Sequence, residues 1–168
     1  MAQLELCPGE TMVSYADLAP RERETADLTK ANLVKSYHPF SKSGHFVSAG
    51  VLVERPDGTY QIFVAANNEV GPTLFSCAEQ GVIREVSNHI QEEELGNISC
   101  MILVDQDGSG RATNKPPFPC PTCRGWIAGL AKRASWGEHL PIYVFRTDLE
   151  VGVKTTIGVL LPHMMDFP

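Results

Sequence analysis

The sequence predicts an α/β fold in which helices cover both faces of a mixed sheet, and three observations support this prediction. Segments with apolar residues at helical spacing alternate with segments rich in Val, Ile and Phe. The turn sequence Pro56-Asp57-Gly58 separates the first two strand segments and predicts a β-hairpin. A length of 168 residues, with 43% hydrophobic and 20% charged residues, suits one globular core. We therefore expect an N-terminal arm over residues 1–15 and a single domain over residues 16–168.

The N-terminal half is expected to contain a helix and a hairpin. A polar stretch with apolar residues at helical spacing predicts a helix over residues 17–37. The helix should end at His38-Pro39, because the residue before a proline disfavours helical backbone. Two strands, over residues 46–54 and 60–67, follow on either side of the turn.

The C-terminal half continues the alternation of helices and strands. Apolar residues three or four positions apart predict a helix over residues 76–93, and a continuous apolar run predicts a buried strand over residues 98–104. Glycine and proline residues predict a long loop over residues 105–119. The remaining expected elements are a helix over residues 120–133, strands over 141–146 and 151–155, and a short helix over 156–164.

Charge and hydropathy exclude several kinds of partner. The formal net charge of −6 argues against a nucleic-acid polymer, because binding a phosphate backbone needs clustered Lys and Arg. No apolar run approaches the ~20 residues that span a bilayer. The N-terminus also lacks a basic segment followed by an apolar one. We expect a cytoplasmic protein with no membrane partner.

The strongest chemical signal is a set of three cysteines. Cys77 opens one expected helix, and Cys120 and Cys123 form a Cys-x-x-Cys that opens another. Three thiolates leave one position of a tetrahedral zinc open, as in catalytic sites, and a helix N-terminus offsets their negative charge. Alone, the Cys-x-x-Cys could be a redox pair. A structural zinc would need a fourth ligand, and neither Cys7 nor the apolar-strand residue Cys100 has a matching spacing.

Glu79 lies two residues after Cys77 and is the candidate catalytic residue. A carboxylate at that position could take a proton from a water and pass it to a substrate nitrogen. Together, Cys77-Ala78-Glu79 and Pro119-Cys120-x-x-Cys123 match the Cys/His-x-Glu…Pro-Cys-x-x-Cys signature of zinc deaminases.

From about Leu28 to Phe167 the chain resembles the small cytidine deaminases. Four segments carry this resemblance besides the cysteines: Tyr37-His38-Pro39-Phe40-Ser41, Val47–Leu52, Asn67-Asn68-Glu69 and Thr156–Pro162. The resemblance implies a cytidine deaminase-like three-layer α/β/α fold with a five-stranded mixed sheet, a Zn²⁺ cofactor and a nucleoside substrate. It also implies a homo-oligomer, a tetramer or possibly a dimer, with sites built partly from neighbouring subunits.

The resemblance further implies substrate-binding residues. Asn67 and Glu69 correspond to side chains that bind the ribose hydroxyls, and Ala78 lies beside them in the implied site. Either His45 or Phe46 occupies the place of an aromatic residue that stacks on the pyrimidine. Without the zinc motif, Asn67-Asn68 would be interpreted as a turn.

The chain also departs from the family pattern. Gln80 stands where the family usually has Arg or His, which leaves Arg124 as a candidate to offset the thiolate charge. The loop 105–119 is longer than expected, and His163 and Met164 replace the usual terminal residues. These departures, together with His45, favour a modified cytosine nucleoside of the blasticidin type as an alternative substrate.

Two other functional classes stay open. A polynucleotide editor would bind single-stranded nucleic acid tightly and in a salt-sensitive way, and such editors usually have His as the first ligand. A non-catalytic zinc protein would keep its function and fold after Glu79→Ala. The leading prediction is hydrolytic deamination of cytidine or deoxycytidine.

Overall fold

The computed structural model describes residues 6–39, 45–71, 74–107, 118–134 and 136–161. Its strands are β1 (Thr11–Val13), β2 (His45–Glu54), β3 (Tyr60–Ala66), β4 (Asn68–Gly71), β5 (Leu74–Ser76), β6 (Ile98–Asp107), β7 (Pro141–Arg146) and β8 (Gly152–Thr156). Its helices are α1 (Pro20–Ala31), α2 (Ala78–His89), α3 (Pro121–Arg133) and α4 (Ile157–Leu160), and short 3₁₀ turns cover Tyr15–Asp17, Asn32–Lys35, Glu92–Asn97 and Gly137–His139.

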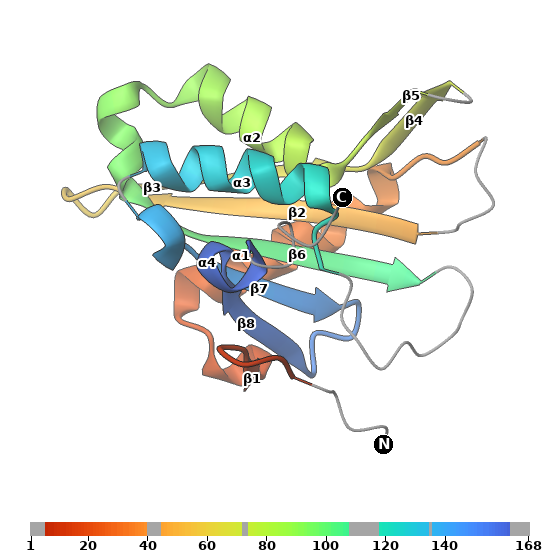
Figure 1. Cartoon of the computed structure of the whole chain (residues 1–168), viewed down its shortest axis with the longest axis horizontal. Helices are drawn as coiled ribbons and strands as arrows, with labels where there is room; N and C mark the ends of the chain where they lie inside the picture. The colour runs from red at the N-terminus through yellow and green to blue at the C-terminus, as the bar shows by residue number, and fades with distance from the viewer. Residues whose placement is uncertain (1–5, 40–44, 72–73, 108–117, 135, 162–168) are drawn as a thin grey trace.

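The main sheet has the strand order β1-β8-β7-β6-β2-β3. Strands β6 and β7 pair in parallel, and the other neighbours pair antiparallel. Helix α1 covers one face, while α2 and α3 lie side by side on the other and begin at the same end of the sheet (Figure 1). The predicted three-layer α/β/α fold with a mixed sheet is confirmed.

Strand β2 divides the core between the two faces. Its residues Ala49, Val51 and Val53 pack with the cluster under α2 and α3, whereas Leu52 packs with the cluster under α1. Gly50 lets α1 approach closely, because a Cβ there would lie 2.1 Å from Thr29 Oγ1. The alternation is that of a strand buried on both faces.

The prediction of five strands is wrong by one, because β1 adds an edge strand. Thr11 pairs with Lys154 of β8, within the segment expected to be an arm. Two of the three residues of β1 are exposed, so no pattern of buried residues marks this strand in the sequence. Its position depends on long-range pairing, which local sequence does not encode.

A separate two-stranded hairpin, β4–β5, was also not expected. It lies directly before α2 and extends from the end of the molecule where α2 and α3 begin (Figure 1). Within it, Asn68 lies opposite Ser76, the residue before Cys77. The hairpin therefore brings the Asn67–Glu69 segment next to the start of α2.

Several boundaries differ from those predicted. Helix α1 ends at Ala31 and continues into a 3₁₀ turn, α2 ends at His89 instead of residue 93, and β6 extends to Asp107, into the expected loop 105–119. The last helix covers only Ile157–Leu160 instead of residues 156–164. The part of that loop at 108–117 and the expected terminal residues 162–168 lie outside the described residues, as do residues 40–44. Among the described helices, none combines the length and the apolar character that crossing a bilayer requires.

Candidate metal centre

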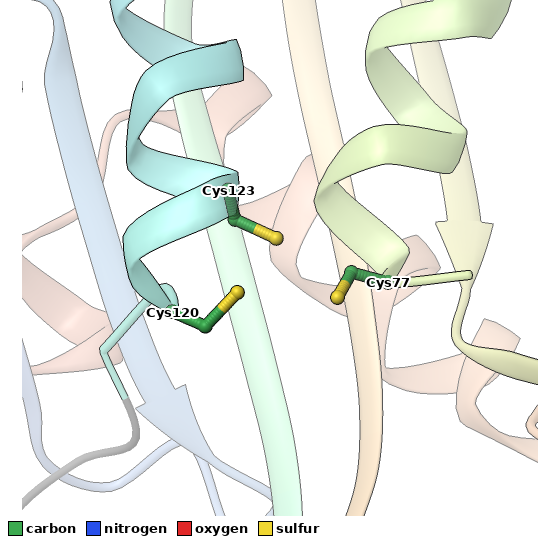
Figure 2. A group of neighbouring side chains, drawn as sticks. All are labelled: Cys77, Cys120 and Cys123. Carbon is green, nitrogen blue, oxygen red and sulfur yellow. The ribbon is translucent and has the colours of Figure 1, made fainter. Parts of the chain in front are cut away.

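Three cysteine thiols from two helices converge at one point. The sulfur atoms of Cys77, Cys120 and Cys123 all lie within 4.8 Å of one another, with Cys77 at the start of α2 and the other two on α3 (Figure 2). Cys123 is buried, Cys77 is half-buried and Cys120 is exposed. The structure thus brings together the three predicted metal ligands.

The donor set fits a zinc ion. Around a tetrahedral zinc with Zn–S bonds of about 2.3 Å, two sulfur atoms lie about 3.8 Å apart. A spacing within 4.8 Å therefore needs an adjustment of about 1 Å at most, within reach of rotations of the cysteine side chains. Among the described residues no His, Asp, Glu or further Cys joins this cluster as a fourth donor. Three protein ligands with an open position are typical of a catalytic zinc.

The local sequence explains why the thiols meet at helix starts. Cys77 and Cys120 are the N-cap residues of α2 and α3, with extended backbone at φ −68° and −62°. Pro121 follows at the first helical position, where its fixed φ and missing N–H are tolerated. Cys123 lies within the first turn of α3. Unpaired N–H groups and the helix dipole at both starts favour negative charge on the thiols.

The thiols also affect one another. A hydrogen bond from the Cys123 thiol lowers the pKa of Cys77, and the same contact raises the pKa of Cys123. Cys77 is therefore the first of these two to ionise. Cys100 differs from these three cysteines, because burial in β6 raises the pKa of its side chain and keeps it a thiol.

Glu79 lies in the first turn of α2, two residues after Cys77, and is only 6% exposed. Burial raises the pKa of its carboxyl, against smaller opposing effects from its own backbone N–H and from Cys123. The interaction with Cys123 places the carboxyl next to the cysteine cluster. A buried carboxyl beside a metal site is suited to hold and release a proton.

Arg124, the candidate to offset the thiolate charge, makes hydrogen bonds to two backbone carbonyl groups. Its Nε donates to Pro119 O at 2.8 Å, and a terminal guanidinium nitrogen donates to Leu160 O at 3.1 Å. The side chain therefore connects the residue before Cys120 to the end of α4. These hydrogen bonds hold the backbone at the start of α3.

Asn67 is buried between β3 and β4, where its side chain holds backbone segments together. Its Oδ1 accepts hydrogen bonds from Val47 N–H at 2.9 Å and from the Ser36 hydroxyl at 2.8 Å. Its backbone N–H also donates to Val47 O at 3.0 Å. The amide oxygen is thus used in connecting the start of β2 to the 3₁₀ turn after α1.

Glu69 is buried on β4 and opposes Phe75 of β5, two residues before Cys77. Its Oε1 lies 3.3 Å from Nδ1 of His38. His38 belongs to a segment that carried the resemblance, but no sequence pattern indicates that its side chain contacts Glu69. A buried acidic residue and a histidine from distant segments meet only once the hairpin is formed.

The other predicted substrate residues have different surroundings. Ala78 is fully buried in the core under α2 and α3. Phe46 is partly buried against the cluster under α1, and its ring makes an edge contact with His38 at 5.4 Å between centroids. The backbone of His45 pairs with Asp107 at the start of β2, and its side chain lies outside the described residues.

Comparisons with known proteins identify solved structures that share this fold. No family model matches the sequence, and no curated protein matches it. Among solved structures, a cytidine deaminase from Burkholderia pseudomallei has 23% identity and a TM-score of 0.62, covering 86% of this chain and 98% of that one. A cytidine deaminase from Mycobacterium tuberculosis has 21% identity and a TM-score of 0.57, covering 89% and 100%. One from Mycobacterium leprae has 23% identity and a TM-score of 0.52, covering 86% and 99%. The chain has the fold of these cytidine deaminases.

Proposed function

We propose that this protein catalyses the zinc-dependent hydrolytic deamination of cytidine or deoxycytidine, giving uridine or deoxyuridine and ammonia. The observation that carries the proposal is the meeting of three thiols and one buried carboxyl at the paired starts of α2 and α3. The likeness to solved cytidine deaminases supports the same reaction class. A redox disulfide pair would not require the third thiol or Glu79.

Cys77, Cys120 and Cys123 would hold the zinc. Zinc, when bound, supplies the Lewis acidity that lets a water act as a nucleophile at neutral pH. Glu79 takes a proton from the attacking water and delivers it to the ring nitrogen beside the carbon under attack. A carbon–oxygen bond forms, the carbon–nitrogen bond to the exocyclic amine breaks, and the second water proton leaves with ammonia.

We assign the nucleoside sugar to Glu69 on β4, the first strand of the β4–β5 hairpin. Glu69 would accept hydrogen bonds from sugar hydroxyls, since a carboxylate has about four lone-pair positions. Asn67 would act chiefly by fixing the backbone around Glu69, given the use of its amide oxygen. His45 and Phe46 remain our candidates for contact with the base. We also propose a homo-oligomer, a tetramer or a dimer, which light scattering on the purified protein would test.

The decisive experiment measures ammonia release and zinc content on the same sample. Glu79→Gln keeps the size of the side chain and removes the proton-accepting group. We expect a folded, zinc-loaded variant with turnover reduced by about 10²–10⁴-fold. Glu85→Gln on the exposed side of α2 is the matched control and should retain full activity. Full activity of Glu79→Gln, or of metal-free protein, would refute the proposed reaction.

A panel of substrates defines the specificity. It should contain cytidine, deoxycytidine, modified cytosine nucleosides of the blasticidin type, and adenine and guanine nucleosides. We expect turnover of cytidine and deoxycytidine and none of the purine compounds. If only a modified nucleoside were deaminated, the reaction class would stand but the proposed substrate would be wrong.

A further inference from the structure

A buried histidine lies against the carboxylate that we assign to the sugar. The side chains of His38 and Glu69 are 4% and 7% exposed, and their Nδ1 and Oε1 atoms are 3.3 Å apart. Burying a carboxylate or an imidazole costs free energy unless a polar partner compensates for the lost water. Each of these groups offers the other such a partner.

The backbone fixes this contact from both sides. Tyr37, the residue before His38, donates its N–H to Asn67 O at 3.3 Å and accepts a hydrogen bond from Glu69 N–H at 2.9 Å. Tyr37 thus forms a parallel bridge with Asn68 along the free side of β4. His38 is held beside Glu69 by main-chain hydrogen bonds and does not reach it through a flexible loop.

Aromatic rings border the histidine. Phe46 makes an edge contact with the His38 ring at 5.4 Å between centroids, and Phe75 makes a tilted contact at 6.3 Å. Apolar neighbours lower the local dielectric, so an electrostatic contact between His38 and Glu69 is stronger here than at the surface. The rings also restrict the orientations that the imidazole can adopt.

We propose that His38 is a positioning residue for the nucleoside sugar: its Nδ1–H donates to Oε1 of Glu69 and directs the remaining lone pairs of the carboxylate at a sugar hydroxyl. This inference rests on the proposed function. Within the described part of the chain, neither ring nitrogen of His38 has a well-aligned hydrogen bond, although Nδ1 is at ion-pair distance from Glu69. Contacts of this kind are often long in a ligand-free site and tighten when substrate binds.

The test is a double-mutant cycle with matched variants. His38→Leu keeps much of the volume and removes the donor, whereas His38→Asn places an amide N–H where Nδ1 lies. Both are combined with Glu69→Ala, and each variant is assayed with zinc-loaded full-length protein for KM and kcat on cytidine. Calorimetric binding of uridine, the product, supplies a second measurement. If His38→Leu does not fold, His38→Gln, whose amide replaces Nε2, takes its place.

His89 provides the control, because its Nδ1 also lies near a glutamate, Glu85, at 3.6 Å. Both side chains of that pair are at least half exposed and lie on α2 away from β4. His89→Leu should leave KM and kcat unchanged, since exposed pairs contribute little.

We expect His38→Leu to raise KM and weaken uridine binding by about tenfold with kcat changed far less. His38→Asn should recover most of that loss, and His38→Leu should have no further effect in the Glu69→Ala background. Additive losses, or a loss confined to kcat, would overturn the positioning role while leaving the deaminase proposal intact. Absence of cytosine nucleoside turnover by the wild-type protein would overturn both.

Discussion

Replacing Gly81 by alanine should displace the first turns of α2, which carry Cys77 and Glu79. Gly81 N–H donates to Cys77 O at 3.1 Å, so Gly81 belongs to the same helical turn as the site. A Cβ at Gly81 would lie 2.8 Å from the Cβ of Ala65 in β3. Carbon atoms in contact are normally about 3.5–4.0 Å apart. The helix and the strand must therefore separate by about 1 Å.

Two opposing effects set the change in stability. Overpacking of this kind costs about 1–3 kcal/mol, and alanine in place of glycine in a helix gains about 1 kcal/mol. We expect a net loss of about 1 kcal/mol in the free energy of unfolding, or a Tm lower by about 3 °C for a domain of this size. A displacement of about 1 Å at Glu79 should also reduce kcat by up to about 100-fold.

Urea unfolding and cytidine turnover, measured on the same zinc-loaded samples, test this expectation. Gly129→Ala on α3 is the control, because a Cβ there meets no atom within 4 Å. It should gain up to about 1 kcal/mol from helix propensity without loss of activity. Ala65→Gly should restore much of the activity of Gly81→Ala. The reasoning fails if Gly81→Ala is as stable and active as Gly129→Ala.

Three further predictions concern the metal centre. Zinc should protect Cys77 from alkylation, whereas Cys100 should stay unlabelled with or without zinc because burial raises its pKa. Peptide mass spectrometry measures the labelling of both residues, and labelling of Cys100 in the folded protein would contradict the prediction. Arg124→Ala should weaken zinc binding by about 10-fold, because the backbone before Cys120 loses its hydrogen bond to this side chain. A competition titration with a chelator measures the zinc affinity, and an unchanged affinity would contradict the prediction. The Tm of the wild type should be about 5–10 °C lower without zinc than at saturating zinc, whereas the Tm of Cys123→Ala should be the same in both conditions. Equal shifts in both proteins would argue against the cluster as the binding site.

The central strands and the cysteine cluster could be predicted because their signals are local. The apolar run from Ile98 to Val104 specifies a strand buried on both faces, and β6 contains it. Cys77 and Cys120 each begin a segment with helical periodicity, which places both thiols at helix starts. For the thiols to meet, the two helices had to lie side by side on one face of the sheet and begin at the same end of it, as they do (Figure 1).

The parts that the sequence did not reveal depend on pairing between distant segments. Strand β1 has three residues, and its pairing with β8 leaves Met12 exposed, so no periodicity marks it. Without the zinc motif, the Asn67-Asn68 dipeptide would be interpreted as a turn, but its backbone joins two strands. Buried hydrogen bonds to Val47 outweigh the turn preference of asparagine there. The His38 contact depends on the same pairing.

The β4–β5 hairpin connects the proposed sugar site to the metal site, and it cannot be stable alone. Isolated two-stranded hairpins of this length are marginal in water, so additional contacts must order it. The bridge from Tyr37 to Asn68 supplies one on the free side of β4, while Ser76 continues directly into Cys77 on the other strand. The segment before β2, the hairpin and the start of α2 therefore form one connected backbone unit. A change that breaks the main-chain hydrogen bonds of Tyr37 should reach the position of Cys77 through this unit, whereas loss of the His38 side chain alone, or a change on the α1 face of the sheet, should not.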